Sequence, residues 1–301
     1  MIVSLNSTSA STHKELGTVN WLRNYDQAVT LSKQTDRPIL ILFQEVPGCQ
    51  GCVDYGQETL THPLIVDAIE NAFIPLAIRN NATSGHDRII LKRFNEPAWN
   101  FQVMRFIDSE GSDIIPRKDR VWTPIETTQR MIQALEAVGR PVPAYLSSIV
   151  LSQEQSKLKT AAFSMYCFWD GEAKLGRIDG VIETEAGWLD GHEVVRLKYD
   201  PHQVEWATLV QKAQALGCAR EVYAPDSQTN KALPKKIRAE LYDKDQFRRA
   251  KASDQKRHLQ FSKYGQLRLN PVQRTKINAA ISARDSKSIQ NWLSPMQLSQ
   301  L

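Results

Sequence analysis

The sequence predicts two mixed domains, one α/β and one α+β, followed by a basic helical C-terminal segment. Strand-like apolar runs alternate with amphipathic helical segments twice, between residues 17 and 145 and again between residues 154 and 230. A length of 301 residues is typical of two domains. Residues 231–301 carry 16 Lys and Arg against 5 Asp and Glu, a net charge of +11, whereas the first 230 residues carry −6.

The N-terminus and the overall composition indicate a soluble protein. Residues 1–16 are rich in Ser and Thr, lack the apolar run of a secretory signal, and are expected to form a disordered tail. No stretch reaches the roughly 18 apolar residues of a membrane span. We therefore expect a cytoplasmic protein with no membrane partner. There, close cysteine pairs are catalytic or metal-binding rather than structural.

The first domain, residues 17–145, is organised around a buried strand and a cysteine pair. Ile39–Phe43 is an unbroken apolar run, which is typical of a central strand covered on both faces. Cys49 and Cys52 follow it in a CxxC motif at the start of a helix that extends to Thr59. The other predicted elements are helices at 19–34, 63–71 and 124–138 and strands at 72–79 and 103–108.

A cysteine pair at a strand-to-helix junction has the properties of a dithiol redox site. The first thiol lies at the helix N-terminus, which favours the thiolate, and the second lies one turn further, within reach to form a disulfide. This order resembles the thioredoxin family, although Gly48 stands where the family usually has Trp. The resemblance implies that Cys49 attacks and Cys52 resolves. The alternatives are an inert pair or a zinc half-site completed by His62 and His86.

The second domain, residues 154–230, places another cysteine at the start of a helix. Cys167 is followed directly by Phe168 and Trp169, and two such aromatics could wall a small apolar pocket. A free cysteine is also often simply packed in the core. The predicted elements are strands at 158–167, 180–188 and 192–199 and helices at 168–175 and 204–216.

Three motifs in register resemble the A-type peptide methionine sulfoxide reductase family. The family's GCFWxxE appears as residues 166–172 (YCFWDGE), and its Gly-Val…Thr…Gly-Tyr strand appears as residues 180–188. Its Gly-His-x-Glu segment and the strand ending in Tyr-Asp-Pro appear as residues 191–201. The resemblance implies a ferredoxin-type α/β sandwich for this domain, after a thioredoxin-like first domain.

The same resemblance implies roles for individual residues. Cys167 would attack the sulfoxide sulfur, Glu193 would protonate the departing oxygen, and Cys218 is a candidate to resolve the resulting sulfenic acid. The substrate pocket would be formed by Phe168, Trp169 and Trp188. Taken singly, Glu193 could be a solvated strand-end carboxylate and Trp188 a core residue.

The loop before the second motif strand departs from the family. The family has about a dozen more residues between its Gly-Tyr and Gly-His-x-Glu motifs, and that loop carries a tyrosine that helps to bind the sulfoxide oxygen. Here only Leu189 and Asp190 separate Trp188 from Gly191. The domain is therefore a trimmed version, which could have lost turnover or could use a different sulfoxide or thiol substrate.

Residues 231–301 form the predicted basic helical extension. Helices are expected at 234–253, 271–283 and 289–298. Such charge runs are usually solvated helix faces, and no nucleic-acid-binding motif accompanies this one. Packing against the more acidic first 230 residues, or against an acidic partner, is the favoured interpretation.

The leading hypothesis is a redox enzyme acting on sulfur, with a function in oxidative stress. A methionine sulfoxide, free or in an oxidised protein, would oxidise Cys167, and the Cys49–Cys52 dithiol would regenerate it. An external reductant resembling thioredoxin reductase would recharge the dithiol, and neither a metal nor an organic cofactor is expected. One alternative is a thiol–disulfide oxidoreductase, acting on a disulfide substrate, with a degenerate second domain used for docking or peroxide sensing. The other is a non-enzymatic scaffold for an acidic partner.

Overall fold

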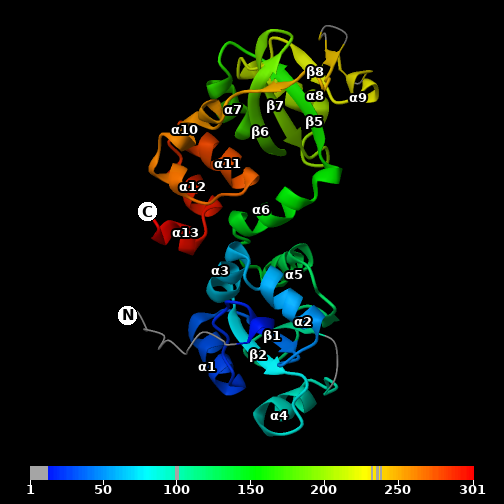
Figure 1. The fold of residues 1–301 in the computed structure, drawn as a ribbon, viewed down its shortest axis with the longest axis vertical. Helices are drawn as coiled ribbons and strands as arrows, with labels where there is room; N and C mark the ends of the chain where they lie inside the picture. Colours follow the sequence, from blue (N-terminus) through cyan, green and yellow to red (C-terminus); the bar gives the residue numbers. More distant parts are fainter. Residues whose placement is uncertain (1–12, 99–101, 232, 235–236, 238) are drawn as a thin grey trace. The chain divides into compact units, whose positions relative to one another are not determined.

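The computed structural model describes all residues except 1–12, 99–101, 232, 235–236 and 238. The chain divides into two compact units, one up to Val150 and one from Leu151 onward, and both appear in Figure 1. Within the described residues no helix combines the length and the apolar composition needed to cross a membrane.

The first unit is built on a four-stranded sheet in the order β2-β1-β3-β4. β1 (Ile39–Gln44) is buried along its whole length, which confirms the central strand predicted from the apolar run. It pairs in parallel with β2 (Ile74–Arg79) and antiparallel with β3 (Val103–Ile107), which pairs with the short β4 (Lys118–Asp119).

Helices cover both faces of this sheet, so alternate residues of β1 enter different cores. Leu40 and Leu42 belong to a core shared with the π-helical turn η2, α3, α5 and α6, whereas Ile41 and Phe43 join a core with α1 and α4. The elements are α1 (Tyr25–Thr35), α2 (Gln50–Asp54), η2 (Tyr55–Thr59), α3 (Pro63–Ala72), α4 (Gly85–Arg93), α5 (Pro124–Ala137) and α6 (Ala144–Gln153).

The second unit contains a six-stranded sheet in the order β10-β6-β7-β5-β8-β9. Its strands are β5 (Lys159–Ser164), β6 (Val181–Leu189), β7 (His192–Tyr199), β8 (Val222–Ala224), β9 (Glu240–Leu241) and β10 (Arg248–Arg249). β6 and β7 form a hairpin whose two turn residues, Asp190 and Gly191, have φ of 49° and 80°. Positive φ at both positions is the requirement of a tight two-residue hairpin.

The two faces of this sheet are covered differently. Phe163, Val195 and Leu197 share the larger core with α7 (Phe168–Gly176) and α8 (Trp206–Ala215). Tyr242 and Phe247 pack on the opposite face. The remaining helices are α9 (Ser227–Lys231), α10 (Arg257–Gln260), α11 (Pro271–Ser282), α12 (Ser286–Trp292) and α13 (Pro295–Ser299), and α11 packs against α7 and β6.

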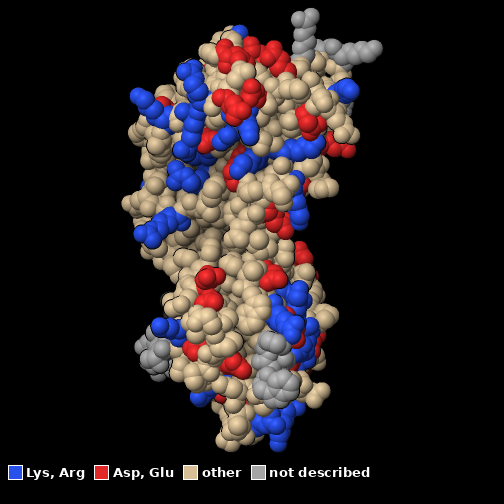
Figure 2. Space-filling model, turned by 45° about the vertical axis from the view of Figure 1, so that its right-hand side comes forward, with Lys and Arg blue, Asp and Glu red and all other residues tan. Residues whose placement is uncertain are grey.

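Residues 231–301 are part of the second unit, and the helix predicted at 234–253 is wrong in its described part. Glu240–Leu241 and Arg248–Arg249 are strands because they pair with β8 and β6 at opposite edges of the sheet. Two basic side chains of residues 231–301 form ion pairs with acidic residues of the same unit, Arg249 with Glu185 and Lys256 with Glu172. On the face drawn in Figure 2, acidic and basic side chains are interspersed.

Two N-terminal predictions also need correction. The helix predicted from residue 19 begins at Tyr25, because Leu22 forms a parallel bridge with Leu76 and the Trp21 indole donates to the Leu16 carbonyl at 2.9 Å. Of the tail predicted to be disordered, residues 1–12 lie outside the described residues, but Lys14–Leu16 form a 3-10 helix. Leu16 is buried in the core there, so the prediction of disorder is wrong at residues 14–16.

Candidate functional site

The first thiol centre lies where β1 leads into α2. Cys49 is the N-cap of α2 and is exposed, whereas Cys52 lies within the helix and is 2% exposed. Their sulfur atoms are 3.5 Å apart, so the two thiols are in direct contact. The cysteine pair therefore has the predicted arrangement: the first thiol is accessible, and the second is buried and in contact with it.

One distant and one nearby side chain, those of Glu15 and Gln44, hold this loop. The Gly48 amide donates to Glu15 Oε1 at 2.7 Å, and the Gln44 side chain donates to the Cys52 carbonyl at 3.2 Å. A Cβ at position 48 would lie 2.5 Å from the Glu45 carbonyl oxygen and 2.8 Å from Cys52 Cβ. That close approach explains why glycine replaces the large residue usual at this position.

Burial raises the pKa of the Cys52 thiol to about 12, and the Cys49 hydrogen bond and the Glu45 charge act in the same direction. The Cys52 thiol is therefore protonated at neutral pH. Among the described residues, the ligand atoms of Glu45, Cys49 and Cys52 form a cluster within 4.8 Å of one another. The histidines considered for a zinc half-site are not part of that cluster, and the imidazole of one, His86, accepts the Tyr25 amide instead.

The second thiol centre lies at the N-terminus of α7. Cys167 is the N-cap of this helix and is exposed, so it is not a packed core cysteine. Phe168 is 5% exposed and meets the Trp188 ring edge-on, with ring centroids 5.6 Å apart. Trp188 itself is 37% exposed, so it is not the core residue that the alternative reading proposed.

Glu193 lies at the same helix end as Cys167. It faces Trp188 across the β6–β7 ladder, and its Oε2 accepts the Phe168 amide hydrogen at 2.8 Å. This bond places the Glu193 carboxyl group at the N-terminus of α7. The tight turn at Asp190 and Gly191 occupies the place of the longer family loop.

The C-terminal segment also reaches this centre. The Arg257 guanidinium lies 3.9 Å from the Trp169 ring centroid and also stacks on Phe261, so Trp169 is covered by a cation. Glu172, the last residue of the YCFWDGE run, is fully buried and forms an ion pair with Lys256. Trp169, one of the aromatics expected to wall the pocket, therefore packs against Arg257, which lies outside the YCFWDGE motif.

The candidate resolving thiol is less accessible. Cys218 is 1% exposed, and its sulfur donates to the Leu216 carbonyl at 3.5 Å. Burial raises its pKa to about 11. In this conformation it is a protonated core thiol, and a resolving role for Cys218 requires that the segment after α8 opens.

Sequence reasoning missed the partners of both centres. Glu15 and Glu45 act at the first centre, and Lys256 and Arg257 act at the second. Glu45 stands four residues before Cys49, so its position was a usable signal. The others are 33 or more residues from the groups they contact, and no local pattern marks them.

Fold and sites together define a thiol protein with two separate cysteine centres, and comparisons with known proteins agree. Residues 20–104 match the family model described as Thioredoxin-like. The chain is 36% identical over 75 residues to peptide methionine sulfoxide reductase MsrA of Geobacter metallireducens, covering 19% of this chain and 46% of that protein. It is 29% identical over 91 residues to peptide methionine sulfoxide reductase A5 of Arabidopsis thaliana, covering 26% of this chain and 36% of that protein.

These matches span less than half the length of each relative. Among solved structures the chain is similar to the DsbH oxidoreductase at 16% identity, with a TM-score of 0.33, covering 46% of this chain and 93% of that chain. A TM-score that low carries no functional argument. The chain thus combines a thioredoxin-like domain with partial homology to A-type methionine sulfoxide reductases. The thioredoxin-like family match and the matches to methionine sulfoxide reductases both support a redox oxidoreductase.

Proposed function

We propose that this protein reduces methyl sulfoxides at Cys167 and draws the electrons from its own Cys49–Cys52 dithiol. The observation that supports this most directly is the Glu193–Phe168 hydrogen bond. It holds a carboxyl group at the helix end that also carries the exposed Cys167. A substrate bound at this helix end would meet both the nucleophile and the proton donor.

The reaction balances as one two-electron reduction. Cys167 attacks the sulfoxide sulfur, and Glu193 protonates the sulfoxide oxygen as its bond to sulfur breaks. The oxygen passes to Cys167, which becomes a sulfenic acid, and the thioether leaves. A second thiol condenses with the sulfenic acid to give a disulfide and water. A third thiol attacks that disulfide, restores Cys167 and forms a mixed disulfide with the second thiol, and a fourth thiol resolves it, so that the third and fourth thiols end as a disulfide.

The Cys49–Cys52 pair is the proposed source of those electrons. We propose that the two centres meet within one chain, which would give the dithiol a higher effective concentration than a separate reductant. Cys218 is proposed to condense with the sulfenic acid before the dithiol reacts. An external reductant resembling thioredoxin reductase then recharges the pair, which requires a reducing compartment such as the cytoplasm. The exposed Cys167 suits methionine sulfoxide in oxidised proteins as well as the free amino acid.

The test measures dithiothreitol-driven reduction of a methyl sulfoxide by the full chain. The wild-type protein is expected to turn over and Cys167→Ser to be inactive, with Cys218→Ser as the matched cysteine control for the resolving step. Equal turnover by wild type and Cys167→Ser would refute the proposal.

A second candidate function is thiol–disulfide exchange alone. It is favoured by the 3.5 Å contact between the sulfur atoms of Cys49 and Cys52. The tight β6–β7 turn also favours it, because this turn replaces the longer loop that the resemblance to the reductase family leads one to expect. The second unit would then serve for docking or peroxide sensing. Insulin-disulfide reduction that survives Cys49→Ser would exclude this function.

A further inference from the structure

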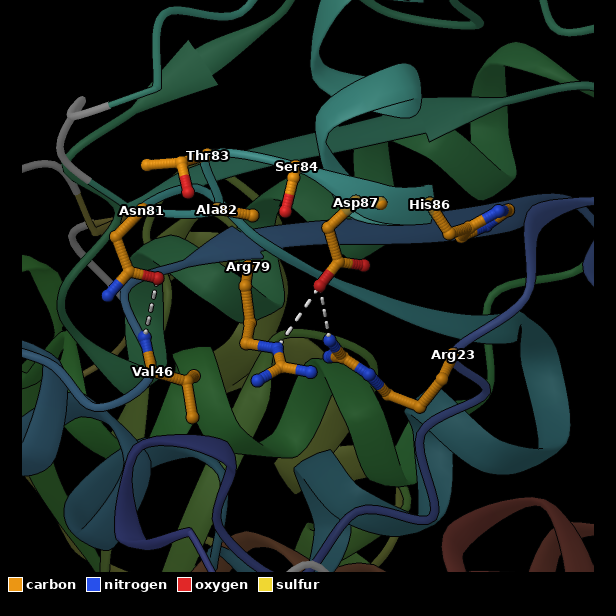
Figure 3. A pocket seen from close by; sticks show the side chains of 10 residues that line it. Arg23, Val46, Arg79, Asn81, Ala82, Thr83, Ser84, His86 and Asp87 are labelled. Atoms are coloured by element: carbon orange, nitrogen blue, oxygen red, sulfur yellow. Dashed lines mark hydrogen bonds and ion pairs between the residues drawn. The ribbon is translucent and has the colours of Figure 1, made fainter.

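A polar cavity of about 460 Å³ lies beside the loop that carries the dithiol. Its wall includes Val46, three residues before Cys49, and the segment from Asn81 to Asp87 (Figure 3). Asn81 joins the cavity to the dithiol loop, because its side chain accepts the Val46 amide at 3.4 Å and donates to the Pro47 carbonyl at 3.1 Å. A cavity of this size suits a small organic molecule.

The charge in this cavity is positive. Arg23 and Arg79 both donate to Oδ2 of Asp87, at 2.9 and 3.1 Å, so two guanidinium groups share one carboxylate oxygen (Figure 3). The Nη1 atom of Arg23 is buried and has no hydrogen-bond partner among the described residues. Burial lowers the pKa of Arg23, and although the Asp87 carboxylate raises it, the neighbouring Arg79 charge lowers it again. Asp87 therefore does not fully offset the cost of burying Arg23, and a second anion would stabilise its charged form.

Further donors face the same space. α4 begins at Gly85, and its N-cap Ser84 makes no side-chain capping bond. Figure 3 shows the Ser84 hydroxyl pointing into the cavity. A Cβ at Gly85 would meet nothing within 4 Å, so the approach to the first amide groups of α4 is open. Guanidinium groups, a hydroxyl and a helix N-terminus together recognise an oxyanion.

From this geometry we propose that the cavity binds the carboxylate or phosphate group of a small disulfide that Cys49 reduces. The inference rests on the proposed dithiol function and names its substrate class. Cys49 thiolate attacks one sulfur of the disulfide, forms a mixed disulfide and releases the first thiolate. Cys52 loses its proton, attacks Cys49 Sγ and releases the second thiolate. Two electrons pass from the dithiol to the substrate, and the Cys49–Cys52 disulfide remains.

The experiment compares two chromogenic disulfides on the full chain carrying Cys167→Ser, which removes the other exposed thiol. 5,5′-Dithiobis(2-nitrobenzoate) carries two carboxylates, and 4,4′-dithiodipyridine is neutral. Arg79→Gln is expected to lower the rate constant for the carboxylated disulfide about five- to tenfold and to leave the neutral one within about twofold. Lys92→Gln, which removes an exposed charge of α4 outside the cavity, is expected to change neither rate.

Equal effects of Arg79→Gln on both disulfides, or no effect on either, would overturn the inference. Arg79 is half-exposed, which makes loss of folding unexpected, and Arg79→Lys provides a second variant that keeps the charge. Competition by inorganic phosphate against citrate, at constant ionic strength, distinguishes the two oxyanions. If the wild-type dithiol fails to react even with the neutral disulfide, the proposed dithiol function fails independently of the cavity.

Discussion

Cys49 and Cys167 each occupy the N-cap of a helix that follows a buried strand, one in each unit. Both are exposed, and both lie at the N-terminus of a helix, which is the positive end of its dipole. Their partners differ: Cys49 faces a second thiol at 3.5 Å, whereas the helix that Cys167 caps binds the carboxylate of Glu193. A thiol partner suits disulfide exchange, and an acid partner suits oxygen removal. In the proposed functions, the same backbone position supplies the nucleophile in both units, and the neighbouring side chain selects the chemistry.

The largest expected effect separates the two centres completely. Cys49→Ser is expected to lower insulin-disulfide reduction about a thousandfold or more, because the attacking sulfur is gone. Cys167→Ser is expected to leave that rate unchanged, since it removes no member of the dithiol. Stopped-flow measurement of both variants checks this, and similar losses in the two would contradict the assignment of separate roles.

The next effect tests how the second centre depends on the C-terminal segment. Glu172→Gln leaves Lys256 buried without its ion-pair partner and is expected to destabilise the second unit by about 3–5 kcal/mol. Hydrogen-exchange mass spectrometry with urea reports each unit separately, and peptides of β1 are expected to be unaffected. Arg249→Gln removes a largely exposed guanidinium from Glu185, which keeps Arg196 as an ion-pair partner, so this control is expected to cost less than about 1 kcal/mol.

Glu193→Gln tests the acid. It is expected to lower sulfoxide reduction about a hundredfold, because the general acid is lost. An amide oxygen can still accept the Phe168 amide hydrogen, so the helix end is expected to keep its structure. Glu205→Gln, an exposed acid in the same unit, is the matched control. Activity that survives in Glu193→Gln would return Glu193 to a structural role.

A further effect, modest over any single pH unit, concerns the pH dependence of the first centre. Burial raises the pKa of Cys52 to about 12, so between pH 7 and 10 its thiolate fraction increases about tenfold per pH unit. Release of the second thiol from a mixed disulfide at Cys49 is therefore expected to accelerate with rising pH by that factor. Absorbance of a chromogenic thiol follows this step directly.

The Glu45 charge also raises the pKa of Cys52, so Glu45→Gln is expected to speed this step about two- to threefold at pH 7. A slower step in Glu45→Gln would instead identify the carboxylate as the proton acceptor of Cys52.

Local sequence patterns predicted the helices and strands whose conformation is determined by neighbouring residues. The apolar run from Ile39 identified β1, and the strand predicted at 192–199 matches β7. The basic run around Arg248 was mistaken for a helix because its conformation depends on pairing with Gly187 and Trp188, some 60 residues away. Likewise, the motifs located Cys49, Cys167 and Glu193, while the covering of Trp169 by Arg257 arises only in the folded unit.

The segment from β9 to β10 closes the second unit in a way that matters for aggregation. It pairs with the last strand at one edge of the sheet, crosses the face on which Tyr242 and Phe247 pack, and pairs with the last strand at the other edge. A chain ending at residue 230 would present two unpaired strand edges and an uncovered apolar face. Such edges pair readily with those of another molecule. The segment from β9 to β10 therefore covers the surfaces through which the second unit would otherwise self-associate.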